Sequence, residues 1–314
     1  MKPTITIIGA GISGLSAGLH LHRKGFTVKI IEASDRVGGR IKTDIVDGFR
    51  LDQGFQVLLT SYPEAKMLLD YDALELKIFL PGATVLYDGG QFEIADPFRR
   101  PSALLATAFA PVGSLKDKFN TFILKNKLIA KSVEGVFAQP QKSSLEQLGD
   151  YGFSTKMINR FFKPFFSGIF LENNLATSNR MFDFVMKMFS EGDAAIPALG
   201  MEEIPKQLAK QLPEHAFLFN TKVVDIQANT IITTTGEQIQ SDIIIVATEA
   251  TALISKYKTT TETKHHSVTN VYFEAKVAPS NKAVVILNAS EKDKIVNNLT
   301  VMTNVSTAYA PAGK

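Results

Sequence analysis

The sequence contains no cysteine. This absence excludes disulfides, thiolate catalysis, Cys-ligated zinc, iron–sulfur clusters and a cysteinyl bond to a cofactor within the chain. A chain without cysteine is indifferent to the redox state of its compartment, so we expect a cytoplasmic location.

The sequence also lacks a strong charge of one sign and a long apolar run. Its 34 Lys and Arg against 31 Asp and Glu give a net charge of +3. So small an excess does not supply the basic field that nucleic acid requires, and nucleic acid is not expected as a partner. No apolar run reaches the length of about 18 residues that a transmembrane helix needs. Peripheral contact with a membrane through a surface stays open.

The composition is that of a folded chain, because 45% of the 314 residues are hydrophobic. This length suits one large or two ordinary domains. The first residues predict a strand at Thr4–Ile8, a helix over 13–24 with Gly25 as a left-handed cap, and a strand at Thr27–Ile31. Two strands joined by a helix in this way lie parallel, as a right-handed βαβ unit. A secretory signal is the alternative interpretation of this apolar start, but it has no need of the strand, glycine and helix order.

The rest of the chain changes its pattern twice. Residues 70–190 are irregular, mostly helical and rich in proline, and the helix expected from Ser178 carries apolar residues on all faces. A further helix is expected over 203–212. Strands are predicted at 217–227, 229–241 and 242–248, with a hairpin turn at Gly236, and then at 267–277 and 282–290 in a second sheet. The continuous apolar run within 242–248 is typical of a strand covered on both faces.

The first chemical motif is Gly9-Ala10-Gly11-Ile12-Ser13-Gly14, which follows the first strand and opens the first helix. The first glycine permits the tight turn, the second lets the backbone approach a pyrophosphate, and the third lets helix pack on strand. Glu32 ends the second strand, where its carboxylate can accept hydrogen bonds from ribose hydroxyls. The motif predicts an adenine dinucleotide, and the negative charge of Glu32 argues against the 2′-phosphate of NADP.

A second glycine turn follows at Ala33-Ser34-Asp35-Arg36-Val37-Gly38-Gly39-Arg40. Adjacent glycines allow another close approach of backbone to ligand, and the arginines offer donors suited to phosphate oxygens. A plain nicotinamide site does not need this turn, so we expect an extended ligand that uses both.

With both turns present, the sequence resembles the flavin amine oxidase superfamily, which includes monoamine and polyamine oxidases, protoporphyrinogen oxidase and phytoene-desaturase-like enzymes. The resemblance is specific across 1–60, fair across 192–250 and loose in between. It implies FAD as cofactor. It places the pyrophosphate at Gly9, Gly11, Ser13 and Gly14, the adenosine ribose at Glu32, and the diphosphate and ribityl side at Arg36, Gly39 and Arg40. Ala33, next to Glu32, is also expected among the cofactor-binding residues.

The resemblance implies two further contacts with the flavin. Gly54, Phe55 and Gln56 match the stretch that passes the isoalloxazine ring, with an ordinary loop as the alternative. Val223 corresponds to a position whose backbone meets the adenine, with plain sheet core as the alternative.

The fold class that follows is α/β, a Rossmann-like FAD-binding domain interleaved with an α+β substrate domain. We expect the FAD-binding domain to comprise 1–70 and 213–250, and the substrate domain 71–212 and 251–314. The superfamily closes its flavin site with a late Gly-Asp pair and a helix, which this sequence lacks before Lys314. Gly192-Asp193 lies in the wrong context to be that pair, so we expect a C-terminally truncated version of a longer enzyme.

The expected chemistry is removal of a hydride equivalent by the flavin, which needs no catalytic triad. No metal site is expected, because the five histidines lack metal-ligand spacing and are interpreted as surface or packing residues. In amine-oxidising members a lysine commonly follows the VAT strand, and the corresponding position here is Asn270. This departure favours a small apolar substrate, as in a desaturase or protoporphyrinogen oxidase, over an amine.

Two alternatives stay open at this stage. One is a flavin amine oxidase that produces hydrogen peroxide, and the other is a non-catalytic binding protein on the same scaffold, like the Rab GDP-dissociation inhibitors. Nine phenylalanines between 153 and 189 are interpreted as core, as the lining of a substrate channel, or as a surface that dips into a bilayer.

Overall fold

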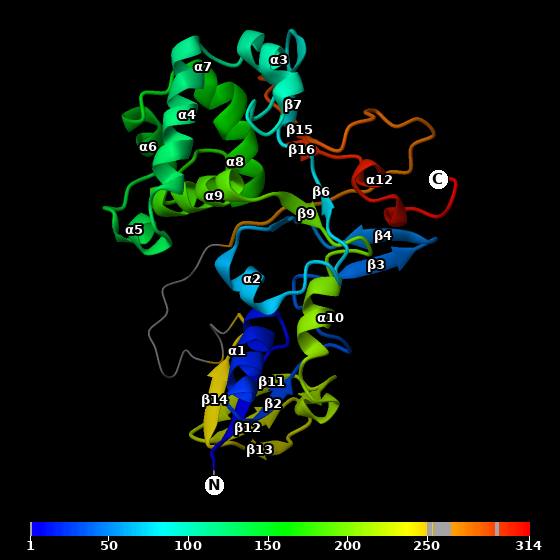
Figure 1. The fold of residues 1–314 in the computed structure, drawn as a ribbon. Helices are drawn as coiled ribbons and strands as arrows, with labels where there is room; N and C mark the ends of the chain where they lie inside the picture. The colour runs from blue at the N-terminus through cyan, green and yellow to red at the C-terminus, as the bar shows by residue number, and fades with distance from the viewer. Residues whose placement is uncertain (1, 250–252, 254–264, 293–294) are drawn as a thin grey trace.

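The computed structural model describes residues 2–249, 253, 265–292 and 295–314. Figure 1 shows two lobes, with strands and a helix from the N-terminal region at one end and the helices of 101–191 at the other. Shorter strands and the C-terminal segment lie between the lobes. Among the described helices, none is long and apolar enough to cross a membrane.

A parallel sheet forms the centre of the first lobe. Its strand order is β10-β2-β1-β14, and every neighbouring pair is parallel. These strands are β1 Thr4–Ile8, β2 Thr27–Ile31, β10 Phe217–Leu218 and β14 Ile243–Val246. Segments from both halves of the chain thus complete one sheet.

Both faces of this sheet are covered. On one face lie helix α1 (Ile12–Arg23) and helix α10 (Glu203–Ala209); on the other lies an antiparallel sheet of β11 Val223–Gln227, β12 Thr230–Thr233 and β13 Gln238–Gln240. Successive strand residues point to opposite faces, so Ile7 packs with Leu15 of α1 whereas Ile8 packs with Ile231 of β12. The residues concerned are almost completely buried.

The predicted βαβ unit is confirmed. Both strands have the expected bounds, and the helix starts and ends within one residue of the prediction. Gly25 follows the helix with a φ of +76°, as expected for a left-handed cap. Gly236 also has a positive φ, +82°, in the turn between β12 and β13.

The single strand predicted over 217–227 is wrong. The segment forms two strands in different sheets, β10 and β11, which Asn220 separates with a φ of +53°. The Asn220 N–H donates to the carbonyl of Ser34, which holds the bend against the end of β2. Asparagine tolerates this left-handed conformation better than most residues, so a turn formed inside an apolar run.

The apolar run at 242–248 forms β14, and its side chains have apolar neighbours on both faces of the sheet, as expected. Ile245 packs with the cluster of Ile7 and Leu15, whereas Ile244 and Val246 pack with the cluster of Ile8 and Ile231. β14 is nevertheless an edge strand that pairs only with β1 among the described strands, and Ile243 is 45% exposed.

The second sheet contains one of the two strands expected after residue 250. β15 (Val285–Asn288) confirms the strand predicted over 282–290, and its sheet has the order β16-β15-β7-β8. The other strands are β7 Ala83–Tyr87, β8 Gly90–Ile94 and β16 Asn298–Leu299. The strand predicted over 267–277 is wrong, because this segment pairs with none of the described strands and is exposed except at Tyr272.

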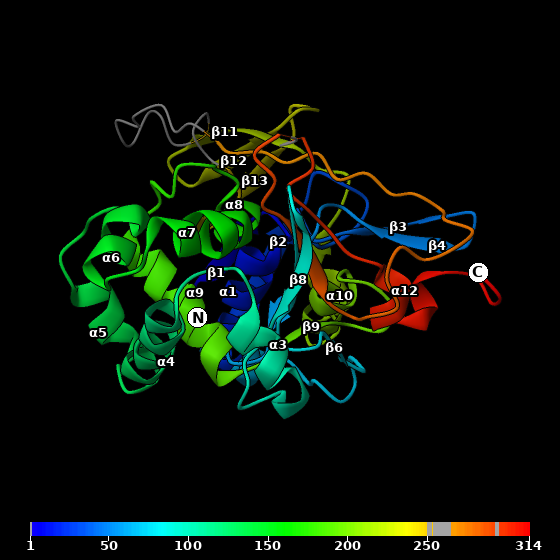
Figure 2. The same cartoon turned by 90° about the horizontal axis from the view of Figure 1, so that it is seen from above.

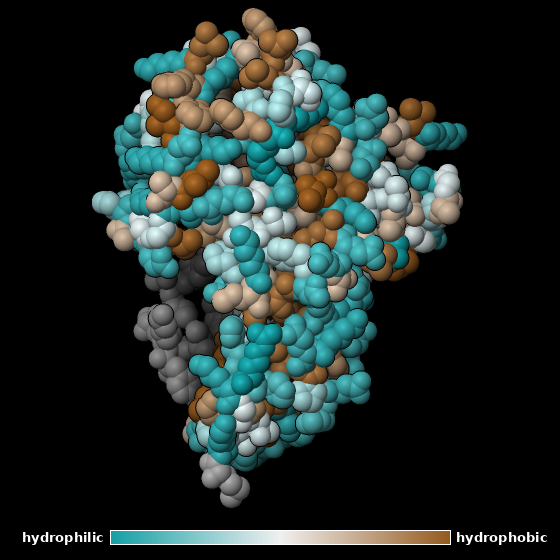
Figure 3. Space-filling view, viewed as in Figure 1, coloured by the Kyte–Doolittle hydropathy of each residue, from teal (hydrophilic) through white to brown (hydrophobic). Residues whose placement is uncertain are grey.

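The second lobe is helical, as the irregular middle region predicted, and Figure 2 shows its helices from above. They are η1 Pro101–Ala103, α3 Leu104–Phe109, α4 Leu115–Ile129, α5 Val133–Ala138, α6 Ser144–Asp150, α7 Thr155–Met157, the π-helical turn η2 Ile158–Phe162, α8 Lys163–Phe170 and α9 Asn179–Glu191. The helix expected from Ser178 is α9, whose residues are mostly buried while Met181 is 43% exposed. Apolar side chains gather at the outer end of this lobe, over α3 and α4 (Figure 3).

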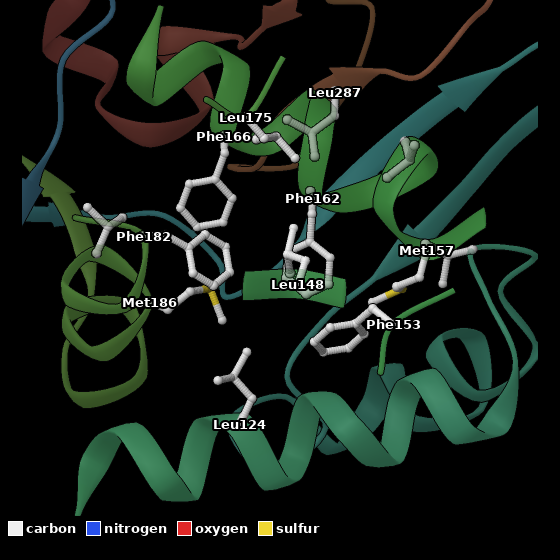
Figure 4. Close-up of a cluster of buried hydrophobic side chains, with 14 of the residues drawn as sticks. Leu124, Leu148, Phe153, Met157, Phe162, Phe166, Leu175, Phe182, Met186 and Leu287 are labelled. Carbon is white, nitrogen blue, oxygen red and sulfur yellow. The ribbon is translucent and has the colours of Figure 1, made fainter. Parts of the chain in front are cut away.

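The phenylalanines between 153 and 189 form the core of the helical lobe. Phe162, Phe166 and Phe182 are fully buried and pack ring against ring, with centroids 4.6 to 6.5 Å apart. Figure 4 shows them between α4, α8, α9 and Leu287 of the second sheet. The other members are buried or packed against this cluster, so the interpretation as core is confirmed.

The remaining elements lie between the lobes or against the first lobe. They are β3 Thr43–Val46, β4 Phe49–Asp52, β5 Leu58–Leu59, α2 Pro63–Leu68, β6 Lys77–Ile78, β9 Ala194–Ile196, η3 Glu214–Ala216, α12 Met302–Val305 and η4 Thr307–Tyr309. The domain boundaries at 70, 212 and 250 stay predictions, and residue 250 lies outside the described residues.

Candidate functional site

The first glycine turn has the geometry that each glycine was expected to provide. Gly9 has a φ of +106°, and a Cβ there would meet the carbonyl oxygen of Ala247 at 2.9 Å. A Cβ on Gly14 would lie 1.9 Å from the carbonyl oxygen of Gly9, so only glycine allows α1 to start this close to β1. A Cβ on Gly11, by contrast, would meet only the Gly39 Cα, at 3.9 Å. The fold does not need glycine at position 11, whereas a ligand that approaches the backbone does.

The second glycine turn lies directly against the first. The Gly38 N–H donates to the Ala10 carbonyl at 2.9 Å, and Gly11 and Gly38 form a parallel bridge. A Cβ on Gly39, which has a φ of +58°, would be 3.2 Å from the Gly11 Cα. The two turns predicted from separate motifs therefore form one surface of closely spaced backbone.

The amino end of α1 opens onto this surface. Gly11 is the N-cap and provides no side-chain cap, and the first turn carries no acidic residue. Ser13 in this turn is exposed. Unpaired N–H groups and the helix dipole make such an end favourable for an anion, here at the junction of the two turns.

Glu32 lies at the end of β2 and faces the first turn. Its Oε2 accepts from the Ala10 N–H at 2.8 Å, and its Oε1 accepts from the N–H and hydroxyl of Ser34 at 2.9 and 2.8 Å. A carboxylate has about four acceptor positions, so one remains for a ligand hydroxyl. A second ligand hydroxyl would have to replace the Ser34 hydroxyl.

The two arginines of the second turn differ in their surroundings. Arg36 forms ion pairs with Asp44 at 2.7 Å and with Glu202 at 2.9 Å. The hydrogen bond with Asp44, and then the charges of Glu202 and Asp44, outweigh burial and raise the pKa of Arg36. Arg40 is exposed, and no described residue pairs with its guanidinium. Arg40 is therefore the available cation, and a direct role for Arg36 at a diphosphate stays a prediction.

The loop expected at the isoalloxazine ring lies beside Arg40. Gln56 donates to the Arg40 carbonyl at 3.1 Å, and Phe55 packs edge to face on Phe79 at 6.3 Å. Gly54 has a φ of +102° with open space where a Cβ would be. The loop is thus joined to the second glycine turn, and its contact with a flavin stays a prediction.

Ala33 and Val223 occupy the other side of the site. Ala33 is exposed directly after Glu32, and Val223 starts β11 opposite Thr233. The chain just before Val223 is held at Glu32, because the Thr221 N–H donates to the Glu32 carbonyl at 2.9 Å. Val223 also packs against the cluster of Ile8 and Ile31, so the adenine role and the core alternative both stay open.

Asn270 lies near the Gly54 loop although the strand predicted around it is absent. The Asn270 side chain forms a hydrogen bond with the Tyr272 hydroxyl, and that hydroxyl donates to the Asp52 carbonyl at 2.9 Å. Burial, and then the charge of Asp52, raise the pKa of Tyr272 to about 12. Asn270 therefore belongs to the same region as the loop that starts after Asp52.

Sequence reasoning missed a buried network below the two turns. Asp52 is 3% exposed and accepts from the Thr43 hydroxyl at 2.5 Å, the Met201 N–H at 2.9 Å and the Tyr309 hydroxyl at 2.7 Å. Glu202, the partner of Arg36, is 5% exposed and its N–H donates to the Thr43 hydroxyl. These residues are far apart in the chain, and nothing in their residue types indicates that they form hydrogen bonds and ion pairs with one another.

The histidines and the Gly192-Asp193 pair take no part in this site. All five histidines are exposed, and His265 pairs with Glu249 at 2.7 Å. Asp193 pairs with Arg99 between α9 and β9. Across the described part of the chain, no three His, Cys, Asp or Glu residues lie close enough to hold a metal ion.

The residues at the two turns fit a dinucleotide. The space at Gly11 is a cradle that a Cβ would fill, the α1 amino end is uncapped, Glu32 keeps an acceptor position, and Arg40 has no partner among the described residues. A hollow of about 600 Å³ lies elsewhere, between Tyr87, Lys163 and Asn288, and contains none of the predicted site residues.

Comparison with known proteins assigns the chain to a family. Residues 12–299 match the family described as flavin containing amine oxidoreductase, and the chain belongs to that family. Family membership confirms the resemblance, the oxidoreductase class and FAD as the cofactor.

Individual relatives match part of their own length. The chain is 25% identical over 166 residues to protoporphyrinogen oxidase 2 of Arabidopsis thaliana, which covers 52% of this chain and 32% of that protein. It is 32% identical over 102 residues to a phytoene desaturase of Fusarium fujikuroi, which covers 30% of this chain and 18% of that protein. The matches thus span less than a third of these relatives.

A solved structure shows the same fold. An oxidoreductase from Methanosarcina mazei superposes with a TM-score of 0.67 at 18% identity, covering 99% of this chain and 76% of that one. The likeness confirms the α/β fold class of the FAD-binding scaffold.

Proposed function

We propose that the chain uses FAD to remove a hydride equivalent from a small apolar substrate, as a desaturase or a protoporphyrinogen oxidase does. The single observation that supports FAD binding is the contact between the two glycine turns, which leaves an open cradle at Gly11. A bound flavin supplies the oxidising chemistry, and the protein holds and orients it.

In this proposal, different residues of the chain hold different parts of the cofactor. The N–H groups of the two turns and the α1 amino end would bind the diphosphate, with Arg40 as the nearby cation. Glu32 would accept from the adenosine ribose, and the loop from Gly54 to Gln56 would lie along the ring.

The apolar substrate class rests on Asn270 and on the relatives. Asn270 lies in the Asp52 and Tyr272 region, which joins the loop expected at the ring, and it offers no amine. Two relatives carry the names protoporphyrinogen oxidase and phytoene desaturase, and neither name refers to an amine. An amine oxidase is the second candidate, since the family name includes it.

The test is reduction of the flavin by defined substrates. The purified chain is reconstituted with FAD, freed of excess cofactor and mixed without oxygen with phytoene, protoporphyrinogen or a polyamine such as putrescine. We expect bound flavin bands that one of the apolar compounds bleaches and the polyamine does not. Bleaching by the polyamine, with hydrogen peroxide on admitting air, would establish the amine oxidase instead. A well-folded, colourless protein would favour the non-catalytic binding protein.

A further inference from the structure

Helix α4 carries apolar residues on two opposite faces. Leu124 and Leu128 lie on the inner face and are almost completely buried in the phenylalanine core. Leu115, Phe119, Phe122 and Ile123 recur at helical spacing on another face and are 43 to 76% exposed. A surface helix of a globular protein normally directs polar residues to solvent, so the outer face of α4 is suited to an apolar partner.

The neighbouring segment continues this apolar face. Leu104, Leu105 and Phe109 of α3 are 52, 70 and 83% exposed, and α3 has no buried residue. The Lys118 ammonium of α4 donates to the carbonyls of Ala108 and Ala110, which fixes the end of α3 against the start of α4.

Phe98 joins the same surface. Its ring, 69% exposed, stacks on the ring of Phe122 with centroids 5.3 Å apart. Figure 1 places α3 and α4 at the same end of the molecule, away from the parallel sheet, and Figure 3 shows apolar residues there. We call the exposed apolar residues of 98–123 the α3–α4 surface.

Positive charges outnumber negative ones around the α3–α4 surface. Residues 98–131 contain seven Lys and Arg and a single acidic residue, Asp117, which is 1% exposed. Three of the seven form ion pairs with carboxylates outside this range: Arg99 with Asp193, Arg100 with Glu93 and Lys125 with Asp96. Because the whole chain has a net charge of only +3, the remainder of the chain is net negative. Lys116 and Lys127 are exposed beside the apolar stripe, and Lys156 lies close enough to Lys118 to lower the pKa of Lys118, after burial.

We propose that the α3–α4 surface docks on an anionic lipid bilayer. Exposed aromatic and aliphatic side chains with a basic border match the acyl region and the negative headgroups of such a membrane. A second copy of this chain is the less suitable partner, because a two-fold contact would place the two basic borders against each other. The α3–α4 surface, and not the buried phenylalanines of 153–189, is therefore the membrane-contacting part of the molecule.

The proposal is tested by sedimentation of the full chain with vesicles. We expect binding to vesicles of 70% phosphatidylcholine and 30% phosphatidylglycerol, about tenfold or more weaker binding to pure phosphatidylcholine, and weakening in 0.5 M salt.

Two pairs of variants separate the apolar and the electrostatic contributions. Phe109→Ser with Phe119→Ser removes two exposed rings, and we expect about tenfold weaker binding. Its matched control is Phe273→Ser with Val277→Ser, which changes residues that are 87 and 83% exposed elsewhere, and which should bind like the wild type. Lys116→Glu with Lys127→Glu should weaken binding about tenfold, whereas Lys24→Glu with Lys210→Glu makes the same change of charge on the other lobe and should not.

Two results would overturn the proposal. One is equal binding of the Phe109 and Phe119 variant and the wild type. The other is no sedimentation with anionic vesicles, including the case in which light scattering shows a dimer that this variant dissociates. The test does not use FAD, so its failure is distinct from failure of the proposed function.

Discussion

At the residue scale, the carboxylate of Glu32 is the predicted ligand-binding group whose position the structure defines most closely. It is fixed by the Ala10 N–H and by Ser34, so its position does not depend on a ligand. Fixing an acceptor in advance reduces the ordering that binding requires.

Replacement of Glu32 by alanine is expected to weaken FAD binding about 10- to 150-fold. A hydrogen bond to a charged group contributes about 1.5–3 kcal/mol, and each 1.4 kcal/mol is a factor of about ten in affinity. Equilibrium dialysis with FAD measures the effect, with the exposed Glu237→Ala variant as the control. Equal affinity of the Glu32 and Glu237 variants would contradict the ribose assignment.

The sequence predicted individual site residues where a backbone requirement selects the residue type. Gly9 and Gly14 belong to this group, because their turns have no room for a side chain. The pairing of Arg36 with Glu202 was not predicted, since ion pairs between distant segments depend on the fold. Arg36 was assigned to the ligand from its donors and from the family resemblance, and the structure shows its Nε and one Nη engaged by two carboxylates.

At the scale of elements, helix α4 shows how a sequence signal fixes a helix start. Ser114 and Asp117 form a capping box, and Asp117 also accepts from the N–H and hydroxyl of Ser154 at 2.7 and 2.8 Å. Burial alone would raise the pKa of Asp117, but the hydrogen bonds from Ser154 and Ser114 outweigh it and lower the pKa.

The stability of the chain is therefore expected to depend on Asp117 in acid. The folded pKa lies below the ordinary value of 3.8, so the contribution is fully present above that value and is lost as the pH falls through the folded pKa. Asp117→Asn should lower the free energy of unfolding by about 1–3 kcal/mol at pH 7 and by less at pH 3. Urea unfolding at both pH values measures this, with exposed Asp72→Asn as the control. A loss that is equal at both pH values would refute the assignment.

Helices and strands could be predicted from the sequence where an apolar periodicity is followed by a residue that ends the element. The first two strands and the helix between them have apolar periodicity bounded by glycines, and their predicted bounds hold. The segment over 217–227 has an apolar pattern with no glycine to interrupt it. The strand ends near Asn220 because the Asn220 N–H forms a tertiary hydrogen bond with the Ser34 carbonyl. The pattern over 267–277 predicted a strand, but a strand requires a partner, and this segment pairs with no strand in the part of the chain that the structure describes.

At the scale of the whole molecule, Tyr309 ties the C-terminal segment to the start of the loop beside the glycine turns. Its hydroxyl donates to Asp52 at 2.7 Å in a buried site, and burial, followed by the charge of Asp52, raises the pKa of Tyr309. The two residues come from distant parts of the chain, so this contact holds the folded topology together.

Tyr309→Phe is expected to lower the free energy of unfolding by about 1.5–3 kcal/mol, because a buried carboxylate loses a donor. Denaturant unfolding measures the loss. The control is Tyr71→Phe, whose hydroxyl donates to the neutral Thr60 carbonyl at 3.1 Å in a half-buried site, with an expected loss of about 0.5–1.5 kcal/mol. A smaller loss for Tyr309→Phe than for Tyr71→Phe would show that the Asp52 contact contributes little.

Titration of the Gly11→Ala variant with FAD tests the central claim most directly. Gly11 has a φ of −74°, and a Cβ there would make only an ordinary contact with the Gly39 Cα at 3.9 Å, so alanine is compatible with the fold but fills the cradle. We expect saturable FAD binding by the wild type, at least about tenfold weaker binding by the variant, and the same Tm for both without FAD. Gly14→Ala is the contrast, because its Cβ would collide with the Gly9 carbonyl and lower the Tm as well. Wild-type affinity in Gly11→Ala, or no saturable binding by the wild type, would contradict the account.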